Sequence, residues 1–316
     1  MWCGDTGMNW TEKYRPKNID EIIGHSKFTD DARGWIDNKE MPNVLIYGVC
    51  NGTGKTSAGH ALANEMLGEH KSTQFLEINA SQDRRLDTIR ETVTNFASTK
   101  CNEDVPFKII LMDELDGMTK DSQRALKRTM EKAFHIRFII TCNAIHEIDS
   151  AIKSRCANYL FNSIGTDNVL SVLKNISKEE KLTLLYTELK MFAEVLGGDM
   201  RRAINELQAI SNSSGTTEFL PLVEKSVEFT SQYERVVDLI SLGDDDEALG
   251  ILLDEVYKGR GIKTIINNLH SIVLNADDIS RIGKYKWLRL LGESEWRSSS
   301  MTPKILVSWL VAQFYE

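Results

Sequence analysis

Residues 44–63, VLIYGVCNGTGKTSAGHALA, have the pattern of a buried strand, a glycine-rich turn and the start of a helix. A phosphate-binding loop runs Gly, four residues, then Gly-Lys-Ser/Thr. Residues 54–56 fit its end, but the position expected for the first Gly holds Val49, and the nearest glycine, Gly48, comes one residue earlier. The strand–turn–helix context is the one that the motif requires, so these residues predict a nucleotide-binding turn in an α/β domain.

Five short apolar runs occur in the first half of the chain, with helical patterns between most of them. Fully apolar strands that alternate with helices form parallel sheets covered on both faces. Residues 1–163 are therefore predicted to form an α/β domain around a parallel sheet. The runs are VLIYG (44–48), FLEINA (75–80), FKIILMDE (107–114), RFIITCNA (137–144) and ANYLF (157–161).

The strand signals stop after residue 163, and the rest of the sequence has the spacing of amphipathic helices. SNSSGTTEF, residues 211–219, is the best candidate for a break within this helical half. We therefore predict two helical modules, 164–225 and 226–316. The apolar residues 305–315 fit a buried packing helix, either between subunits or in the chain's own core.

The composition, 41% hydrophobic and 27% charged over 316 residues, is that of an ordinary globular protein. The start, MWCGDTGMNW, has no apolar run, and no apolar segment is long enough to span a bilayer, so we expect a cytoplasmic or nuclear protein that is not secreted. Five scattered cysteines without a C-x-x-C pair argue against a disulfide framework and a structural zinc site. A net charge of −8 argues against indiscriminate coating of nucleic acid, but allows a local basic patch.

Within the turn, GTGKT at residues 52–56, each residue type has a role in phosphate binding. The glycines let backbone N–H groups turn toward phosphates at the helix N-terminus. Lys55 is expected to reach the β and γ phosphates, and the Thr56 hydroxyl to bind Mg²⁺. The alternative is a glycine-rich strand-to-helix turn that happens to contain Lys-Thr.

Two strand ends downstream carry polar residues that suit nucleotide hydrolysis. IILMDE ends in Asp113, which would support Mg²⁺ through its water shell, and Glu114, which would polarise a water for attack on the γ-phosphate. FIITCN ends in Asn143, whose amide both donates and accepts hydrogen bonds and so can hold that water and the γ-phosphate. Each feature alone also fits an ordinary strand end.

Arginines in two later segments fit roles at a γ-phosphate. Arg155, in SRC, is either a solvated surface charge or an arginine finger offered to a neighbouring subunit. GGDMRRAINELQ (197–208) places Arg201 and Arg202 near a helix N-terminus, where two cations oppose the helix dipole. A bound phosphate would remove that conflict.

Taken together and in order, seven segments within residues 9–210 resemble the small subunits of replication factor C and the ATPase subunit of tailed-phage clamp loaders. The resemblance implies an AAA+ ATPase that uses ATP and Mg²⁺. Its subunits would form a pentameric spiral around primer–template DNA and open a ring-shaped sliding clamp, with the helical modules as lid (164–225) and oligomerisation collar (226–316). The segments are WTEKYRPKNIDEIIGH (10–25), GTGKTS (52–57), EINASQDR (77–84), MDELDGMTKDSQRALKRTME (112–131), TCNA (141–144), KSRC (153–156) and GGDMRRAINELQ (197–208).

The resemblance also implies residue roles. Arg155 would be a finger acting on the next subunit, Asn143 and Arg201 would be the two sensors, and Asn79 would restrain Glu114 until DNA arrives. The implied ATP-binding residues are Thr11 and Ile23 at the adenine and Gly52, Thr53, Gly54, Lys55, Thr56, Ser57, Asn143 and Arg201. The implied catalytic residues are Lys55, Asp113, Glu114, Asn143 and Arg155, and the implied metal contacts are Thr56 and Asp113.

The loop itself departs from the family pattern. The usual form has two prolines between the first Gly and GTGKT, whereas this chain has VCN, one residue more. Phage clamp-loader ATPases also have an extended loop here, so we interpret it as a tolerated bulge.

A non-hydrolysing scaffold subunit of the same kind of assembly is the alternative function. Another AAA+ machine, such as a helicase or an initiator, is disfavoured by EKYRP and SRC.

An acidic protein that encircles DNA needs its positive charge on the inner face. Two helices supply candidate DNA contacts. The alternative for both is an ordinary solvated helix face with Lys/Arg–Glu pairs and no role in DNA binding. Binding would be independent of base sequence and sensitive to salt. ASTKCNEDVPF (97–107) matches the clamp-contacting loop of the family. The candidate DNA contacts are Arg84, Arg85, Arg90, Arg124, Lys127 and Arg128.

Overall fold

The computed structural model describes residues 8–80, 86–102, 105, 107–196, 198–212, 232–276 and 279–314. The chain forms two compact units, Met1–Glu218 and Phe219–Glu316. The predicted division into three parts, with boundaries after residues 163 and 225, stays a prediction.

The first unit contains a five-stranded sheet in the order β2-β3-β4-β1-β5, with every neighbouring pair parallel. The predicted α/β class is therefore confirmed. Each apolar run of the sequence contains one strand. The strands are β1 (Val44–Tyr47), β2 (Phe75–Asn79), β3 (Lys108–Asp113), β4 (Ile136–Cys142) and β5 (Ala157–Leu160).

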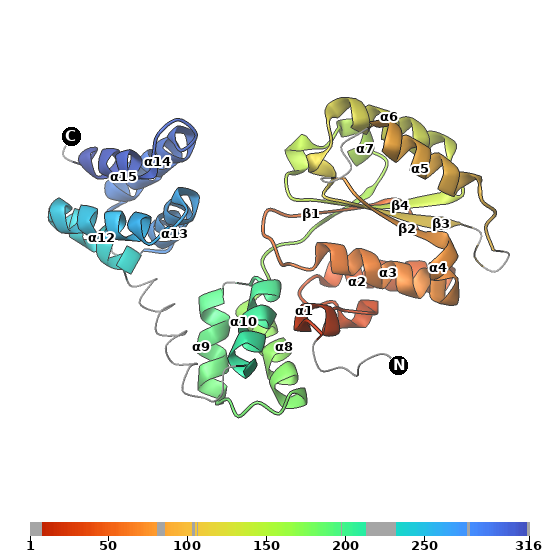
Figure 1. Ribbon diagram of the computed structural model, residues 1–316, viewed down its shortest axis with the longest axis horizontal. Coiled ribbons are helices and arrows are strands. Elements are labelled where there is room, and N and C mark those ends of the chain that lie inside the picture. Colours follow the sequence, from red (N-terminus) through yellow and green to blue (C-terminus); the bar gives the residue numbers. More distant parts are fainter. Residues whose placement is uncertain are drawn as a thin grey trace. The chain divides into compact units, whose positions relative to one another are not determined.

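Helices cover both faces of this sheet, with α2, α3 and α4 on one face and α5, α6 and α7 on the other (Figure 1). The described residues of the first unit also include a short N-terminal helix, α1, and four 3₁₀ turns. The helices are α1 (Trp10–Lys13), α2 (Ser26–Asn38), α3 (Lys55–Leu67), α4 (Lys71–Gln74), α5 (Leu86–Ser98), α6 (Lys120–Lys132) and α7 (Ser150–Lys153). The turns are η1 (Ile19–Glu21), η2 (Gly68–His70), η3 (Leu115–Gly117) and η4 (Ile145–Glu147).

The two faces of the sheet make two separate hydrophobic cores because strand side chains alternate. Val44 and Ile46 of β1 pack with Ala58 and Leu62 of α3, whereas Leu45 belongs to the core under α5 and α6. All five of these side chains are inaccessible to solvent. The continuous apolar runs in the sequence follow from this burial on both faces.

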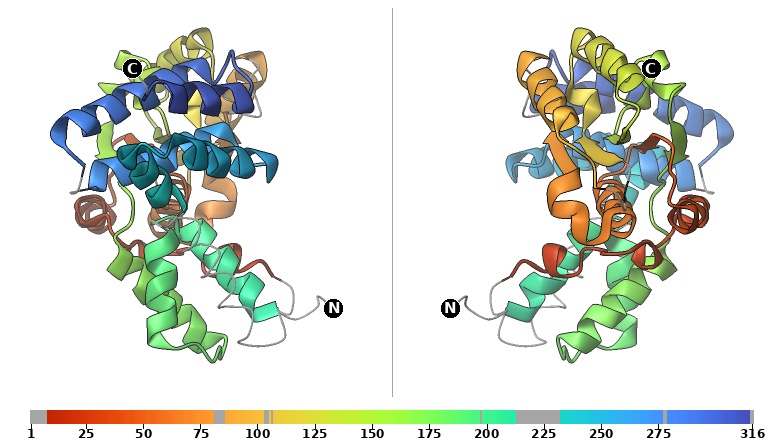
Figure 2. Two further views of the ribbon diagram at one scale, coloured as in Figure 1. Left: turned by 90° about the vertical axis from the view of Figure 1, so that its left-hand side faces the viewer. Right: turned by 90° about the vertical axis from the view of Figure 1, so that its right-hand side faces the viewer.

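Three helices after the sheet, α8 (Thr166–Glu179), α9 (Tyr186–Leu196) and α10 (Met200–Asn212), pack against one another. We call them the lid helices. Figure 2 shows them in green, beyond the sheet and its covering helices. The N-terminal helix α1 packs on α10, where the Trp10 N–H donates to Gln208 Oε1 at 2.9 Å. The lid helices and the N-terminal segment are thus in direct contact.

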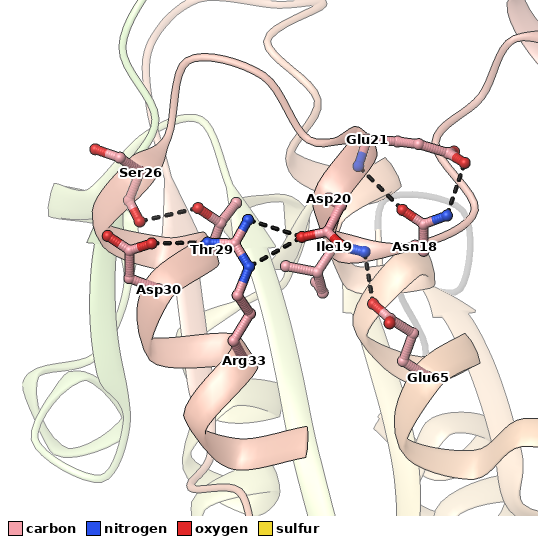
Figure 3. Close-up of polar contacts among 9 residues, drawn as sticks. All are labelled: Asn18, Ile19, Asp20, Glu21, Ser26, Thr29, Asp30, Arg33 and Glu65. Carbon is pink, nitrogen blue, oxygen red and sulfur yellow. Dashed lines mark hydrogen bonds and ion pairs between the residues drawn. The ribbon is translucent and has the colours of Figure 1, made fainter. Parts of the chain in front are cut away.

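The segment between α1 and α2 is fixed to its neighbours by polar contacts (Figure 3). Asn18 caps η1, and the Ile19 N–H donates to Glu65 Oε2 of α3 at 2.6 Å. Arg33 of α2 donates through Nε and Nη2 to Asp20 Oδ1 at 2.9 and 2.7 Å. These contacts hold the N-terminal segment along the helix that begins at the glycine-rich turn.

The second unit is helical in its described part and has its own apolar core. Its C-terminal helix buries Leu306, Val307, Leu310 and Val311, as expected for a packing helix. Of the helices in the described part of the chain, none combines the length and hydropathy that a bilayer crossing needs. The described helices are residues 232–242, α12 (Asp245–Tyr257), α13 (Ile262–Asn275), α14 (Arg281–Arg297) and α15 (Pro303–Ala312).

Candidate active site

The glycine-rich turn between β1 and α3 has the backbone geometry of an anion cradle. Gly52 and Gly54 adopt the left-handed region, with φ of +69° and +90°, which glycine enters without steric cost. Gly54 is the N-cap of α3 and has no side chain to cap the helix, so the first N–H groups of α3 stay available. Together with the helix dipole, these groups favour a bound phosphate.

The extra residue of the loop projects outward. The Val49 side chain is 87% exposed, and Cys50 is exposed as well. Gly48 cannot carry a side chain, because a Cβ would lie 2.1 Å from the carbonyl oxygen of Phe161, the residue after β5. Lys55 Nζ donates to the carbonyls of Gly48 at 3.0 Å and Cys50 at 2.8 Å. The bulge at Val49 therefore leaves the glycine-rich turn and Lys55 in place. Burial lowers the pKa of Lys55.

Four polar groups meet where α3 begins and β3 and β4 end. Thr56 at the start of α3 donates its hydroxyl proton to Asp113 Oδ1 at 2.8 Å, and Thr141 of β4 donates to the same oxygen at 2.5 Å. The Glu114 N–H donates to Thr141 Oγ1 at 3.1 Å. Glu114 itself adopts the left-handed region, with φ of 55°, which costs a residue with a side chain about 1–2 kcal/mol. Its backbone is thus held in a strained conformation by a turn and a neighbouring strand.

Asn143 follows β4, and its backbone is fixed by an acidic side chain of η3, the turn after β3. Asp116 Oδ2 accepts the N–H groups of Asn143 at 3.1 Å and Ala144 at 3.0 Å. The neighbouring Cys142 is buried, and burial, reinforced by Asp116, raises the pKa of its thiol to about 12. Cys142 therefore supplies no thiolate to this site near neutral pH.

The lid meets the glycine-rich turn at the start of α10. The Met200 N–H donates to the Gly52 carbonyl at 3.2 Å, and a Cβ on Gly52 would lie 1.8 Å from Asp199 Oδ1. Asp199 Oδ1 also accepts the Arg202 N–H at 3.0 Å. This carboxylate at the helix N-terminus offsets part of the unfavourable interaction between Arg201, Arg202 and the dipole. A bound phosphate is therefore not the only group that can relieve that conflict.

The N-terminal segment supplies another wall. Its residues Thr11 and Ile23 line the cavity described below. Lys13 Nζ and Tyr14 Oη both donate to Glu180 Oε1, at 2.7 and 2.6 Å, just after α8. These bonds with Lys13 and Tyr14 hold the pKa of Glu180 below its ordinary value. The segment is therefore tied to the lid by a charged side chain.

His25 contacts the backbone of the glycine-rich turn. Its ring stacks on Phe161 with centroids 3.7 Å apart, and its Nε2 donates to the Thr53 carbonyl at 3.0 Å. Only 8% of the residue is exposed. The side chain thus joins the end of the N-terminal segment, the turn and the end of β5.

A cavity of about 910 Å³ lies between the glycine-rich turn, the N-terminal segment and the lid. It brings together every predicted ATP-binding residue, whose roles stay predictions. Those residues are Thr11, Ile23, Gly52, Thr53, Gly54, Lys55, Thr56, Ser57, Asn143 and Arg201. Asp113 and Glu114 line the same cavity.

Arg155, the predicted finger, is not among the residues that line this cavity. Its guanidinium donates to Glu131 Oε1 of α6 at 2.5 Å and to the Ala151 carbonyl at 2.7 Å. Both charged side chains are partly exposed. Arg155 therefore lies at the surface of its own chain, away from the cavity that the chain itself forms.

The predicted DNA contacts fall into two groups. On α6, Arg128 is exposed, Lys127 is partly buried and Arg124 pairs with Asp121 at 3.0 Å. Arg84 and Arg85 lie outside the described residues, as does the side chain of Arg90.

Residues 103, 104 and 106 of the predicted clamp-contacting loop also lie outside them. Asn79, the predicted restraint on Glu114, pairs in register with Asp113.

The side-chain oxygens of Thr56 at the start of α3 and Asp113 at the end of β3 suit Mg²⁺. A hydroxyl and a carboxylate from Thr56 and Asp113 lie within hydrogen-bond distance of each other. Mg²⁺ prefers such hard oxygen ligands and keeps several waters when it binds with nucleotide phosphates. In the part of the chain that the structure describes, no cluster of three or more His, Cys, Asp or Glu residues forms a metal site. The residues therefore fit a metal that arrives with a nucleotide.

Sequence reasoning missed four contributors to this site, namely Thr141, Asp116, His25 and Glu180. The first two have a signal in the sequence, because each lies within three residues of a predicted catalytic residue at a strand end. His25 and Glu180 carry no comparable signal. Their partners, Thr53 and Lys13, are 28 and 167 residues away in the chain.

This fold and site define a P-loop ATPase of the AAA class. Residues 44–164 match the family described as ATPase family associated with various cellular activities (AAA). A replication factor C small subunit from Methanococcus vannielii is 35% identical over 297 residues, which cover 91% of this chain and 92% of the relative. A probable replication factor C subunit 5 from Dictyostelium discoideum is 36% identical over 97% of this chain and 90% of its own length. The chain belongs to the family of replication factor C small subunits.

Solved structures support the fold. The RuvB Holliday junction branch migration motor of Thermotoga maritima superposes with a TM-score of 0.56 over 81% of this chain and 85% of that one. At 15% sequence identity this similarity concerns the fold alone. The two chains therefore share a fold over most of their length.

Proposed function

We propose that this chain is the ATPase subunit of a sliding-clamp loader, which uses ATP binding and hydrolysis to open a ring-shaped clamp and load it on primer–template DNA. The observation that carries the proposal is that four of the five predicted catalytic residues, Lys55, Asp113, Glu114 and Asn143, line one cavity in a member of the replication factor C small-subunit family. Its partners would be other loader subunits in a pentameric spiral, the clamp, and DNA bound without sequence specificity. Such a role would place it in the cytoplasm or the nucleus.

Each step of hydrolysis can be assigned to residues of this chain. The N–H groups of the turn and Lys55 bind the phosphates, Thr11 and Ile23 enclose the base, and Arg201 reaches the phosphates from the lid. Glu114 orients the attacking water and takes its proton, while the Asn143 amide holds the water against the γ-phosphate. Bound Mg²⁺, held by Thr56 and by Asp113, would neutralise charge on the phosphate oxygens.

Hydrolysis is favoured over a scaffold that binds nucleotide without chemistry. A scaffold version could lose the base, the sensor or the finger without losing the fold. Here Glu114, Asn143 and Arg155 are all present, and the outward bulge of the loop leaves Lys55 next to the turn. These features support an active subunit.

The test is steady-state ATP hydrolysis by the complex recovered with this chain. Primer–template DNA should stimulate hydrolysis strongly, and blunt duplex should stimulate it little. A complex containing Lys55→Ala should lose turnover, because the cation that binds the β and γ phosphates is gone. Mg-ATP binding without turnover under either condition would contradict the proposal and favour the scaffold.

A further inference from the structure

Thr141 contacts both acidic residues at the tip of β3. Its hydroxyl donates to Asp113 Oδ1 at 2.5 Å and accepts the Glu114 N–H at 3.1 Å, and the residue is only 2% exposed. We propose that Thr141 is a positioning residue for ATP hydrolysis, which fixes the carboxylate of Asp113 and the backbone of Glu114. The inference rests on the proposed function, because that function assigns the chemistry to these two carboxylates.

The sheet register places Thr141 beside these residues. Met112 of β3 pairs with Ile140 of β4, so Thr141 is the next residue along β4, beside Asp113. Strand alternation puts Thr141 on the same face as Ile139, which packs in the core under α3. The hydroxyl therefore points to the face from which α3 presents Thr56.

Two hydroxyls converge on one carboxylate oxygen. Thr56 and Thr141 both donate to Asp113 Oδ1. Thr56 is also the predicted contact for Mg²⁺, so its bond to Asp113 competes with that role. The Thr141 hydroxyl is buried and uses both its proton and a lone pair within the chain. It can therefore hold Asp113 whether or not a nucleotide is bound.

The effect on Glu114 is through the backbone. Glu114 has φ of 55° and ψ of 49°, its N–H is bound by Thr141, and its carbonyl accepts the Gly117 N–H at 2.9 Å. The conformation is sparsely populated for a residue with a side chain, so it persists only while its surroundings hold it. Without the hydroxyl, one of the two bonds disappears and the glutamate can rotate away from the water that it orients.

Two substitutions separate positioning from packing. Thr141→Val keeps the shape of the side chain and removes the hydroxyl, whereas Thr141→Ser keeps the hydroxyl and removes a methyl group. In the assembled complex with primer–template DNA, Thr141→Val should lower kcat by about 10²-fold, the loss expected for a misplaced catalytic group. The KM for ATP and the ATP affinity of the isolated chain should not change. Thr141→Ser should retain most of the turnover.

A second measurement needs no nucleotide. In a chain labelled with [¹⁵N]glutamate, the Glu114 amide should exchange with solvent faster in Thr141→Val than in the wild type. In Thr141→Ser it should exchange at the wild-type rate. The thermal midpoint of each variant shows whether the fold is intact.

Wild-type kcat in Thr141→Val, or unchanged exchange of the Glu114 amide, would overturn the proposal. So would losses of turnover in both variants that follow their thermal midpoints, since these would indicate packing alone. If the wild-type complex itself fails to hydrolyse ATP, the proposed function is wrong. The exchange measurement then still decides whether Thr141 holds Glu114.

Discussion

At the scale of single residues, His25 is a buried titratable side chain that contacts the backbone of the glycine-rich turn. The pKa of His25 lies below the ordinary value of 6.5, mainly because the ring is buried. The hydrogen bond to Thr53 raises this pKa, and the charge of Lys55 lowers it further. The native state therefore contains the neutral imidazole, whose Nε2 proton is donated to the Thr53 carbonyl.

We expect the free energy of unfolding to decrease as the pH falls below 6.5. In that range the unfolded chain protonates this histidine, whereas the folded chain does so only at a lower pH, so protons favour unfolding. The contribution of the neutral ring is fully present above pH 6.5. Urea unfolding on both sides of this pH measures the slope.

His25→Gln should reduce that slope, because glutamine keeps an amide donor and does not titrate. His60, whose pKa burial also lowers, should account for part of the remainder. His146→Gln is the matched control, since the side chain of His146 is 78% exposed. Equal slopes for His25→Gln and the wild type would contradict the assignment.

At the scale of elements, Glu180 of the lid joins the lid to the N-terminal segment through its hydrogen bonds with Lys13 and Tyr14. Because its partners Lys13 and Tyr14 belong to the segment that lines the cavity, Glu180→Ala should weaken ATP affinity. Partly exposed ion pairs contribute at most about 1 kcal/mol, so the expected loss is up to about fivefold. Titration of the isolated chain with a fluorescent ATP analogue measures it.

Glu194→Ala is the control for this change. Glu194 is also a lid glutamate, but its ion pair with Lys190 at 3.9 Å stays within α9. It should leave ATP affinity unchanged. Equal affinities for the two variants would mean that the segment is positioned without Glu180.

Helix α6 carries the predicted DNA contacts that the structure describes. Replacing Arg124, Lys127 and Arg128 with alanine should reduce stimulation of hydrolysis by DNA and flatten its salt dependence. Removal of one side chain that binds a DNA phosphate lowers the slope of log affinity against log salt by about one. DNA binding measured at several salt concentrations gives that slope. As a control, a variant with Lys178 and Lys190 of the lid neutralised should behave like the wild type. If DNA stimulates the α6 variant as strongly as the wild type, DNA binds elsewhere on the chain.

At the scale of the whole molecule, Arg155 is predicted to act on a neighbouring subunit. Its guanidinium pairs with Glu131 and does not line its own chain's cavity. Arg155→Ala should therefore leave ATP binding by the isolated chain intact, yet reduce hydrolysis by the assembled complex about 10³-fold or more. Glu131→Gln, which keeps the finger, should retain turnover. Weaker ATP binding by isolated Arg155→Ala would refute action on a neighbouring subunit.

Much of the first unit follows from local sequence. Buried strands covered on both faces need continuous apolar residues, so all five strands were predictable from their runs. The turn was predictable because Gly52, Gly54 and Lys55 carry their conformations and chemistry within five residues. The extra residue was interpreted as a tolerated bulge, and the exposure of Val49 in the structure agrees with that interpretation.

Only the tertiary structure decided which side chains support these groups. Thr141 reaches Glu114 across 27 residues because β3 and β4 pair in parallel with one particular register. His25 and Glu180 meet the turn and the N-terminal segment only after the chain has packed. Motifs are visible in a sequence when their atoms are neighbours along the chain. Contacts between distant segments depend on register and packing, which no short segment encodes.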